Sequence, residues 1–186
     1  MRKENITVIG LGYVGLPLLI ELSKKFVVKG FDINKKKILQ LKEGSEPDLI
    51  LNKTELKKLK KLELTHNPKD IQQSNVYIIC VPTPISKHKL PDLSLLKNAS
   101  KIVGKVISDK DLVILESTVF PGATEEVCVP LIEKYSKLTP TKLQFFFFTR
   151  KESLLRSMAT VVNPPLLSHK TSRSTFQRAV ESTAEM

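Results

Sequence analysis

The stretch ITVIGLGYVGLPLLIEL (Ile6 to Leu22) decides the fold of this chain. It opens with ITVIG, a short β-branched run that ends in glycine, and this predicts a buried parallel strand. The next segment, YVGLPLLIELSKKF, spaces its leucines at helical intervals and ends in lysines, which predicts a helix. The turn between them, GLGYVG (Gly10 to Gly15), fits the G-x-G-x-x-G pattern that is typical of dinucleotide-binding proteins.

Each glycine of this turn has a physical role. Gly10 allows a tight turn, Gly12 lets the backbone approach a pyrophosphate, and Gly15 lets the helix pack on the strand. Asp32 follows Gly12 by about 20 residues and ends the next predicted strand, FVVKGFDI, so it is expected to bind the adenosine ribose. Its carboxylate would repel a 2′-phosphate, which favours NAD over NADP. Lys37 either reaches the ribose or is one more solvated lysine.

Short apolar runs and amphipathic stretches alternate as far as residue 147. Asn34 and Gly44 bracket one predicted helix as N-cap and C-cap, and Asp92 stands at the cap of another. This alternation predicts an α/β fold, a Rossmann-type doubly wound parallel sheet of about six strands. The further expected strands are LELTHN, NVYIICVPTP, DLVILEST and LQFFFF, and the further expected helices are NKKKILQLKEG, residues 54–61, DLSLLKNASKIVGKVI and GATEEVCVPLIEKYSK.

The chain of 186 residues carries a net charge of +11, which raises the question of an acidic partner such as nucleic acid. However, the lysines of residues 34–44 and 53–64 alternate with Leu and Ile at helical intervals, so they are expected on the solvent side of two helices. No aromatic residue is interleaved with them to stack on bases. A solvated helix face is therefore favoured, and nucleic acid binding is a minor hypothesis.

Cys80 and Cys128 form neither a CxxC pair nor a metal-ligand spacing, which fits a reducing cytoplasm and predicts no metal site. Both are interpreted as small buried hydrophobic residues. The basic start of the chain imitates a signal peptide, but Asn5 and several glycines interrupt the apolar run, and Glu21 ends it too early for a membrane span. The chain is expected to be cytoplasmic, with no membrane partner.

Two further segments end predicted strands at the carboxyl edge, where open α/β sheets bind ligands. VPTP (Val81 to Pro84) ends the fourth strand and holds the Thr83 hydroxyl between two prolines, although a simple strand-ending turn is the alternative. ESTVFPGAT (Glu116 to Thr124) ends the fifth strand, and its Ser117 and Thr118 are expected to point into the same crevice.

VIGLGYVGLPL, FDIN, VPTPI, PDLSLL and ILESTVFPGATEE resemble, in order and spacing, the N-terminal domain of the UDP-glucose/GDP-mannose dehydrogenase family. The resemblance is strongest to its UDP-N-acetylglucosamine and UDP-N-acetylgalactosamine 6-dehydrogenases, which make uronic acids for surface polysaccharides. It implies that Thr118 lies close to the reaction as a supporting catalytic residue. Lys37 departs from the family's usual arginine and keeps the charge without the bidentate fork. The expected cofactor-binding residues are Gly10, Gly12, Tyr13, Val14, Gly15, Asp32, Lys37, Val81, Thr83, Ser117 and Thr118.

The chain departs from the family after LQFFFF. There the family continues into a motif resembling Y-S-P-E-R-I-x-P, whose Glu serves substrate and catalysis, whereas this chain continues as FTRKESLL. Read one frame away, starting at the third base of the Phe148 codon, the codons allow P-E-R-I-x-P, and a T-rich run of Phe codons favours slippage. Residues 1–147 are therefore interpreted as an NAD-binding Rossmann domain and 148–186 as a frameshifted or disordered tail. A genuine divergent tail is the alternative.

The resemblance also implies an incomplete active site. The family oxidises carbon 6 of a UDP-sugar twice, with two NAD molecules and a thiohemiacetal on a downstream cysteine in a glycine-rich loop. Neither Cys80 nor Cys128 lies in such a loop. The chain is expected to bind NAD without turnover and to engage a UDP-sugar only if the missing domain is supplied. The resemblance implies a homodimer for the family's full-length members. A stand-alone NAD-binding module or inactive pseudoenzyme is the alternative.

Overall fold

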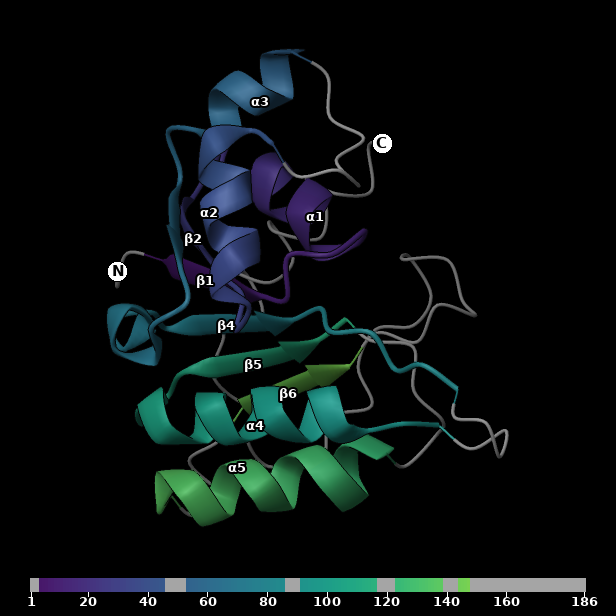
Figure 1. Ribbon diagram of the computed structural model, residues 1–186. Coiled ribbons are helices and arrows are strands. Elements are labelled where there is room, and N and C mark those ends of the chain that lie inside the picture. Colours follow the sequence, from purple (N-terminus) through teal and green to yellow (C-terminus); the bar gives the residue numbers. More distant parts are fainter. Residues whose placement is uncertain (1–3, 46–52, 86–90, 117–122, 139–143, 148–186) are drawn as a thin grey trace.

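The computed structural model describes residues 4–45, 53–85, 91–116, 123–138 and 144–147. These residues form a parallel sheet of six strands in the order β3-β2-β1-β4-β5-β6, with helices on both faces (Figure 1). The predicted doubly wound parallel sheet is confirmed. The elements are β1 (Asn5–Ile9), α1 (Gly15–Leu22), β2 (Val27–Phe31), α2 (Lys35–Glu43), α3 (Lys53–Leu59), β3 (Glu63–Thr65), the 3-10 helix η1 (Pro68–Ile71), β4 (Val76–Ile79), α4 (Ser94–Val106), β5 (Leu112–Leu115), the π-helix η2 (Thr124–Cys128), α5 (Val129–Ser136) and β6 (Gln144–Phe147).

The strand order reverses direction at the centre of the sheet. β1 pairs with β2 on one side and with β4 on the other, and its last residue, Ile9, lies in register with Phe31 and Ile79. The chain leaves β1 outwards through β2 and β3, returns to the centre with β4, and continues outwards through β5 and β6. Open parallel sheets bind ligands beyond the carboxyl ends of the strands at such a reversal. The loops after β1 and β4 therefore form the expected binding edge.

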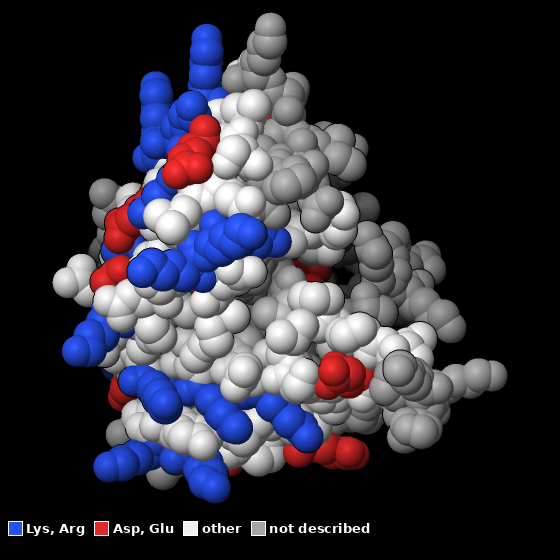
Figure 2. Space-filling model, viewed as in Figure 1, with Lys and Arg blue, Asp and Glu red and all other residues white. Residues whose placement is uncertain are grey.

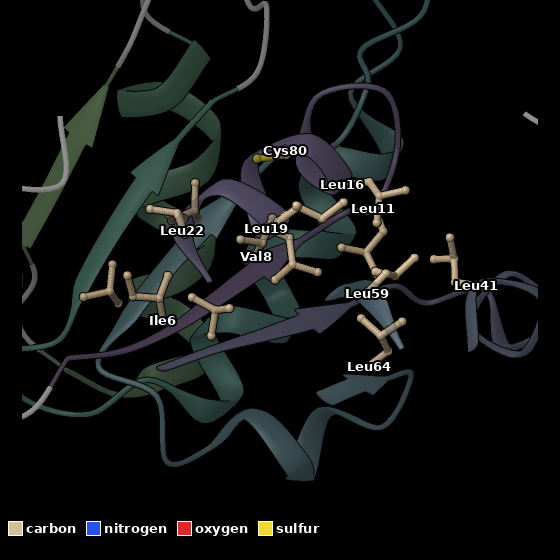
Figure 3. Packing of buried hydrophobic residues seen from close by; sticks show 14 of the residues in the cluster. Ile6, Val8, Leu11, Leu16, Leu19, Leu22, Leu41, Leu59, Leu64 and Cys80 are labelled. Atoms are coloured by element: carbon tan, nitrogen blue, oxygen red, sulfur yellow. The ribbon is translucent and has the colours of Figure 1, made fainter. Parts of the chain in front are cut away.

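Alternate side chains of the strands build two separate cores. Ile6 and Val8 of β1 belong to a buried cluster that also contains apolar side chains of α1, α2 and α3. Figure 3 shows leucines of α1 close to these two strand residues. Ile9 belongs instead to a second cluster, with Tyr77 of β4 and the apolar faces of α4 and α5. Because successive strand residues point to opposite faces, this alternation fixes the register that positions the loops.

Two of the predicted helix caps are observed in α2. The Asn34 side chain accepts a hydrogen bond from Lys37 N at 3.2 Å, and Gly44 ends the helix with a left-handed backbone of φ 77°. The Asp92 carboxylate accepts a hydrogen bond from Ser94 N at 2.9 Å at the start of α4. A carboxylate or amide oxygen in these positions satisfies an N–H group that the first helical turn leaves without a partner.

The helix predicted over GATEEVCVPLIEKYSK differs from the structure in its first turns. Residues Thr124–Cys128 form a π-helix, and Val129–Ser136 are α-helical. Pro130 has no N–H to donate to the carbonyl four residues earlier, and its ring crowds that carbonyl, so a wider turn precedes it. The helix that follows the glycine turn also begins later than its periodicity predicts, at Gly15.

Lysine side chains lie on the solvent face of α2 and α3, as predicted. Ile38, Leu41 and Leu59 are buried beneath them, whereas Lys35 and Lys57 are exposed. Figure 2 shows these basic side chains over the upper left of the molecule and a further group over α4 and α5. None of the described helices has the length and apolar character that crossing a membrane requires.

Candidate dinucleotide site

The loop after β1 is a tight turn built on Gly10. Its backbone has a φ of 92°, and its N–H donates a hydrogen bond to Phe31 O at 2.8 Å, which joins the turn to the end of β2. A Cβ at this position would lie 3.0 Å from both the Cys80 carbonyl oxygen and Val81 Cγ1. The positive φ and the lack of space both require glycine, so the tight turn predicted for Gly10 is observed.

Gly12 and Gly15 lie in opposite environments. A Cβ on Gly15 would overlap the Gly10 carbonyl oxygen and would lie 3.1 Å from Cys80 Cβ. Only glycine at position 15 therefore lets α1 start directly against the turn. A Cβ on Gly12 would meet no atom within 4 Å. The fold itself does not need glycine at position 12, and the space beside it is open to a ligand.

The first turn of α1 offers backbone N–H groups at this opening. Leu16 N donates to Gly12 O at 3.1 Å, whereas the N–H groups of Tyr13, Val14 and Gly15 have no acceptor within the described part of the chain. No side chain caps this helix. Tyr13 is 77% exposed and Val14 is 41% exposed. Unpaired N–H groups at the positive end of a helix dipole attract an anion such as a phosphate.

The Asp32 carboxylate lies beside the turn, just beyond the end of β2. Its Oδ2 accepts a hydrogen bond from Leu11 N at 3.1 Å, and its Oδ1 accepts one from Asn34 N at 3.0 Å. The Asp32 N–H donates to Thr65 O at 3.1 Å, so the backbone here is also tied to β3. The residue is only half-buried. Each carboxylate oxygen can accept a further hydrogen bond, and together they suit the two hydroxyls of a ribose.

Lys37 lies in the first turn of α2, at the same edge of the sheet as Asp32. The residue is half-buried, and its backbone N–H is used by the Asn34 cap. Both described ion pairs, Lys24–Glu21 and Lys29–Glu63, involve other lysines. These observations do not choose between a ribose contact and a solvated lysine, so the role of Lys37 stays a prediction.

Val81 and Thr83 follow β4, and the structure brings Val81 to the glycine turn. Val81 Cγ1 lies 3.0 Å from the position of a Gly10 Cβ, so the loops after β1 and β4 touch each other. Thr83 is half-buried in the same loop. Asp92 N donates to Pro84 O at 2.7 Å, which closes this loop on the start of α4.

The end of β5 lies next to the end of β4, because Glu116 N donates to Ile79 O at 2.8 Å. The next residues, Ser117 and Thr118, lie outside the described residues, as does the rest of the segment to residue 122. Their assignment to the crevice, and the supporting catalytic role of Thr118, therefore stay predictions.

Both cysteines are free and buried, as predicted. Burial, and secondly the nearby Glu116 carboxylate, raises the pKa of the Cys80 thiol far above its usual value. Burial likewise raises the pKa of the Cys128 thiol. A neutral buried thiol is a poor nucleophile and metal ligand. Among the described residues no cluster of His, Cys, Asp and Glu could hold a metal ion.

Sequence patterns do not single out Leu11, the variable residue of the first G-x-G, although it links the two parts of the site. Its N–H bonds to Asp32, and its side chain is 1% exposed. A Cβ on Gly30, inside β2, would lie 3.1 Å from Leu11 Cδ1. A glycine inside a strand often marks such a close approach. Gly30 was therefore the feature of the sequence that could have indicated a side chain packed against β2 at this point.

The chemistry of these residues fits a dinucleotide. The unpaired N–H groups of the turn suit a diphosphate, the open space beside Gly12 admits it, and the Asp32 carboxylate suits a ribose diol. All three features lie at the carboxyl edge where the strand order reverses. The site can bind and orient such a molecule.

Comparisons with known proteins agree with this geometry. A model of the NAD binding domain of the UDP-glucose/GDP-mannose dehydrogenase family matches residues 4–164. UDP-N-acetyl-D-glucosamine 6-dehydrogenase from Pseudomonas aeruginosa is 51% identical over 138 residues, which cover 74% of this chain and 33% of that protein. Protein CapL from Staphylococcus aureus is 49% identical over 136 residues, 73% of this chain and 32% of that protein. The chain thus spans about a third of the length of these curated relatives.

The fold is also that of a solved relative. UDP-D-ManNAc dehydrogenase from Pyrococcus horikoshii matches the chain with a TM-score of 0.74 at 29% sequence identity. The match covers 96% of this chain and 44% of that structure.

Proposed function

This chain belongs to the UDP-glucose/GDP-mannose dehydrogenase family, as its NAD binding domain, and on that premise we propose that it binds NAD at the glycine turn. One observation carries the proposal: the N–H groups of Tyr13, Val14 and Gly15 at the start of α1 have no acceptor within the described part of the chain. In contrast, the Asn34 side chain caps α2, and the Asp92 carboxylate accepts from Ser94 N at the start of α4, although Leu93 is the N-cap there. At the start of α2 and of α4 a side chain therefore accepts a hydrogen bond from a backbone N–H, whereas the N–H groups at the start of α1 are left for a ligand.

Each feature of the site has a distinct role in this proposal. The N–H groups of the turn hold the diphosphate, and Gly12 lets the backbone approach it. Asp32 orients the adenosine ribose and disfavours the extra phosphate of NADP. NAD, when bound, supplies the ring that accepts a hydride from an alcohol. The residues that we propose to contact it also include Tyr13, Val14, Lys37, Val81, Thr83, Ser117 and Thr118.

We extend the proposal to the activity of a complete protein. The relatives named above from Pseudomonas aeruginosa and Pyrococcus horikoshii are nucleotide sugar dehydrogenases, so a UDP-sugar oxidised at carbon 6 is the proposed substrate, with Thr118 in support. That activity needs the region that these relatives have beyond the matched third of their length. For such a complete protein we propose a homodimer in the cytoplasm.

Calorimetric titration with NAD tests the proposal. The wild-type chain is expected to bind NAD at one site. Gly12→Ala is expected to weaken binding at least tenfold without lowering Tm, because its methyl group enters space that the fold leaves open and the ligand needs. No heat at millimolar NAD, or unchanged affinity in Gly12→Ala, would contradict the proposal.

Gly104→Ala is the matched control. A Cβ on Gly104 would lie 2.9 Å from Tyr135 Cβ and 3.0 Å from Ile132 O, between α4 and α5 and away from the turn. This variant is expected to lower Tm and to leave the NAD affinity of the folded protein unchanged. The two alanine substitutions therefore separate the loss of a ligand from the loss of packing.

A stand-alone NAD-binding module is the second candidate function. It is favoured by the six-stranded sheet and its two buried clusters, which the described residues build by themselves. Mixing the chain with the C-terminal two thirds of a relative, NAD and a panel of UDP-sugars separates the candidates. Reduction of NAD with any of the UDP-sugars supports the dehydrogenase. Binding of NAD without its reduction by any UDP-sugar of the panel supports the module.

The division of the chain at Phe147 is a further proposal. Residues 148–186 lie outside the described residues, and the family match continues to residue 164. Resequencing the DNA around the Phe codons tests the frameshift: a missing or added base supports it, and an intact reading frame contradicts it.

A further inference from the structure

Resting on the proposed NAD site, we propose that Asp32 is also a positioning residue, which holds the glycine turn in the shape that receives a diphosphate. The proposed contact with the ribose accounts for a carboxylate at the end of β2, but not for the bond that this carboxylate makes to the glycine turn. The structure adds that this carboxylate also bonds to the turn itself, through Leu11 N. The phosphate-binding and ribose-binding parts of the site are thus one unit.

The two carboxylate oxygens accept hydrogen bonds from two segments that lie side by side in the fold. Oδ2 accepts from Leu11 N at 3.1 Å, in the turn after β1, and Oδ1 accepts from Asn34 N at 3.0 Å, before α2. The carboxylate therefore bridges two loops that are far apart in the chain. The backbone of Asp32 is itself fixed by the bond from its N–H to Thr65 O, so the bridge starts from a rigid strand end.

Leu11 is held from two sides by this arrangement. Its side chain is buried in the cluster beneath α1, α2 and α3 (Figure 3), where Gly30 leaves room for it. Its N–H is held by Asp32. Leu11 lies between Gly10 and Gly12, which lack side chains to anchor them. The two anchors on Leu11 therefore limit the conformations of the whole turn before a ligand arrives.

A consequence concerns cofactor preference. Replacing Asp32 removes the group that disfavours NADP, but it also releases Leu11 N. Such a variant is expected to lose affinity for every ligand with the same diphosphate, including ligands that never contact the carboxylate. Selectivity and turn geometry are therefore coupled through one side chain.

The test compares NAD with an NAD analogue that lacks the 2′- and 3′-hydroxyls of its adenosine ribose. Calorimetry measures both ligands against wild type and Asp32→Asn. Asparagine keeps one acceptor oxygen, which can serve either Leu11 N or Asn34 N, so Asp32→Ala, which removes both bonds, is measured beside it. We expect the analogue to bind about tenfold more weakly to Asp32→Ala than to wild type, a loss of about 1.4 kcal/mol. Equal affinity would overturn the positioning role.

Hydrogen exchange supplies a readout that needs no ligand. In the wild type, the Leu11 amide is expected to exchange at least tenfold more slowly than the amides of Tyr13 and Val14. In Asp32→Ala it is expected to exchange faster, while the amide of Val8 in β1 keeps its rate. A wild-type Leu11 amide that exchanges as fast as that of Tyr13 would overturn the proposal, even if no variant folds.

Asn34→Ala is the matched control. It removes the side-chain cap of α2 but keeps the Asp32 carboxylate and the backbone N–H that bonds to it. The analogue affinity and the Leu11 exchange rate are expected to equal those of wild type. A loss in Asn34→Ala as large as in Asp32→Ala would assign the effect to α2 and overturn the proposal.

The proposed function and this inference fail in different ways. If the wild type binds NAD but neither the analogue affinity nor the Leu11 exchange depends on Asp32, only the positioning role is refuted. If Leu11 exchange depends on Asp32 but no NAD binds, the positioning of the turn stands and the NAD site is refuted.

Discussion

At the amino end of the sheet, polar side chains bond to one another, whereas at the carboxyl end N–H groups of the glycine turn have no partner among the described residues. Near the amino end, the buried hydroxyls of Thr7 and Ser74 lie 2.6 Å apart, and Asn5 N donates to Asn75 Oδ1 at 3.0 Å. Buried polar groups usually find such partners.

The difference separates polar groups that stabilise the fold from those that serve a ligand. Thr7 is fully buried, so its hydroxyl contributes to stability only through its partner. The turn at the other end carries the exposed Tyr13 and Val14, and the N–H groups of Tyr13, Val14 and Gly15 have no acceptor among the described residues. Substitutions at the two ends are therefore expected to have opposite signatures, one in Tm and the other in affinity.

Gly15→Ala is expected to have the largest effect, because both the fold and the site require the close approach of α1 to the turn at this residue. The new Cβ would overlap the Gly10 carbonyl oxygen, which belongs to the backbone and cannot rotate away. We expect a loss of about 3 kcal/mol or more in the free energy of unfolding, together with loss of NAD binding. Chemical denaturation measures the first effect and calorimetry the second. A stable Gly15→Ala protein that binds NAD would contradict the claim that both the fold and the site require glycine at position 15.

Ser74→Ala is expected to affect the amino end alone. It leaves the buried Thr7 hydroxyl without its partner at a cost of about 1–3 kcal/mol. The NAD affinity of the folded protein is expected to stay unchanged. The double variant Thr7→Val/Ser74→Ala serves as control and is expected to regain part of the lost stability, because neither polar group then remains. Weaker NAD binding in Ser74→Ala would show that the two ends are coupled.

Asn34→Ala sharpens the comparison within the carboxyl end itself. Asn34 lies next to Asp32, yet its side chain caps α2 rather than facing a ligand. The substitution is expected to cost about 1 kcal/mol of stability and to change NAD affinity by less than twofold. Thermal unfolding and calorimetry on the same sample measure both. A large loss of affinity with no change in Tm would place the Asn34 side chain in the binding site.

Asp92→Asn is expected to have the smallest effect, a small loss of Tm that diminishes in acid. The N–H of Ser94 holds the pKa of the Asp92 carboxyl below its usual value, with a smaller contribution from the Lys97 charge. A lowered folded-state pKa adds stability above the unfolded-state pKa of about 3.9, and that stability is lost as pH falls through the lowered value. The Tm difference between wild type and Asp92→Asn should therefore be constant near neutral pH and shrink below about pH 4. A difference that grows in acid would contradict this assignment.

Features encoded over a few residues were predictable from the sequence. The glycine turn, the caps at Asn34 and Gly44 and the six apolar strands each depend on local geometry, and the structure contains all of them. The π-helix before Pro130 was not predicted, although a proline in that helix is a local signal. Helical periodicity alone does not distinguish a wider turn from an α-helical one.

Contacts between segments that are distant in the chain could not be predicted from the sequence patterns. Thr7 and Ser74 are 67 positions apart, and their pairing depends on the register of β1 with β4. The bond from Leu11 to Asp32 spans 21 positions, so the pattern identified the carboxylate but not its second partner. Periodicity and fingerprints specify types of residue at spacings, whereas these bonds depend on where loops end after the sheet has formed.

Titration of NAD into the ¹⁵N-labelled chain, followed by the backbone amide signals, tests the central claim most directly. The account predicts that the largest shifts occur at residues 10–15 and at Asp32, with smaller shifts at Val81 and Thr83. The amides of Thr7, Ser74 and Asn75 are predicted to stay unchanged. No shift at millimolar NAD, or shifts centred on the amino end of the sheet, would contradict the claim that the glycine turn is the part of this molecule reserved for a ligand.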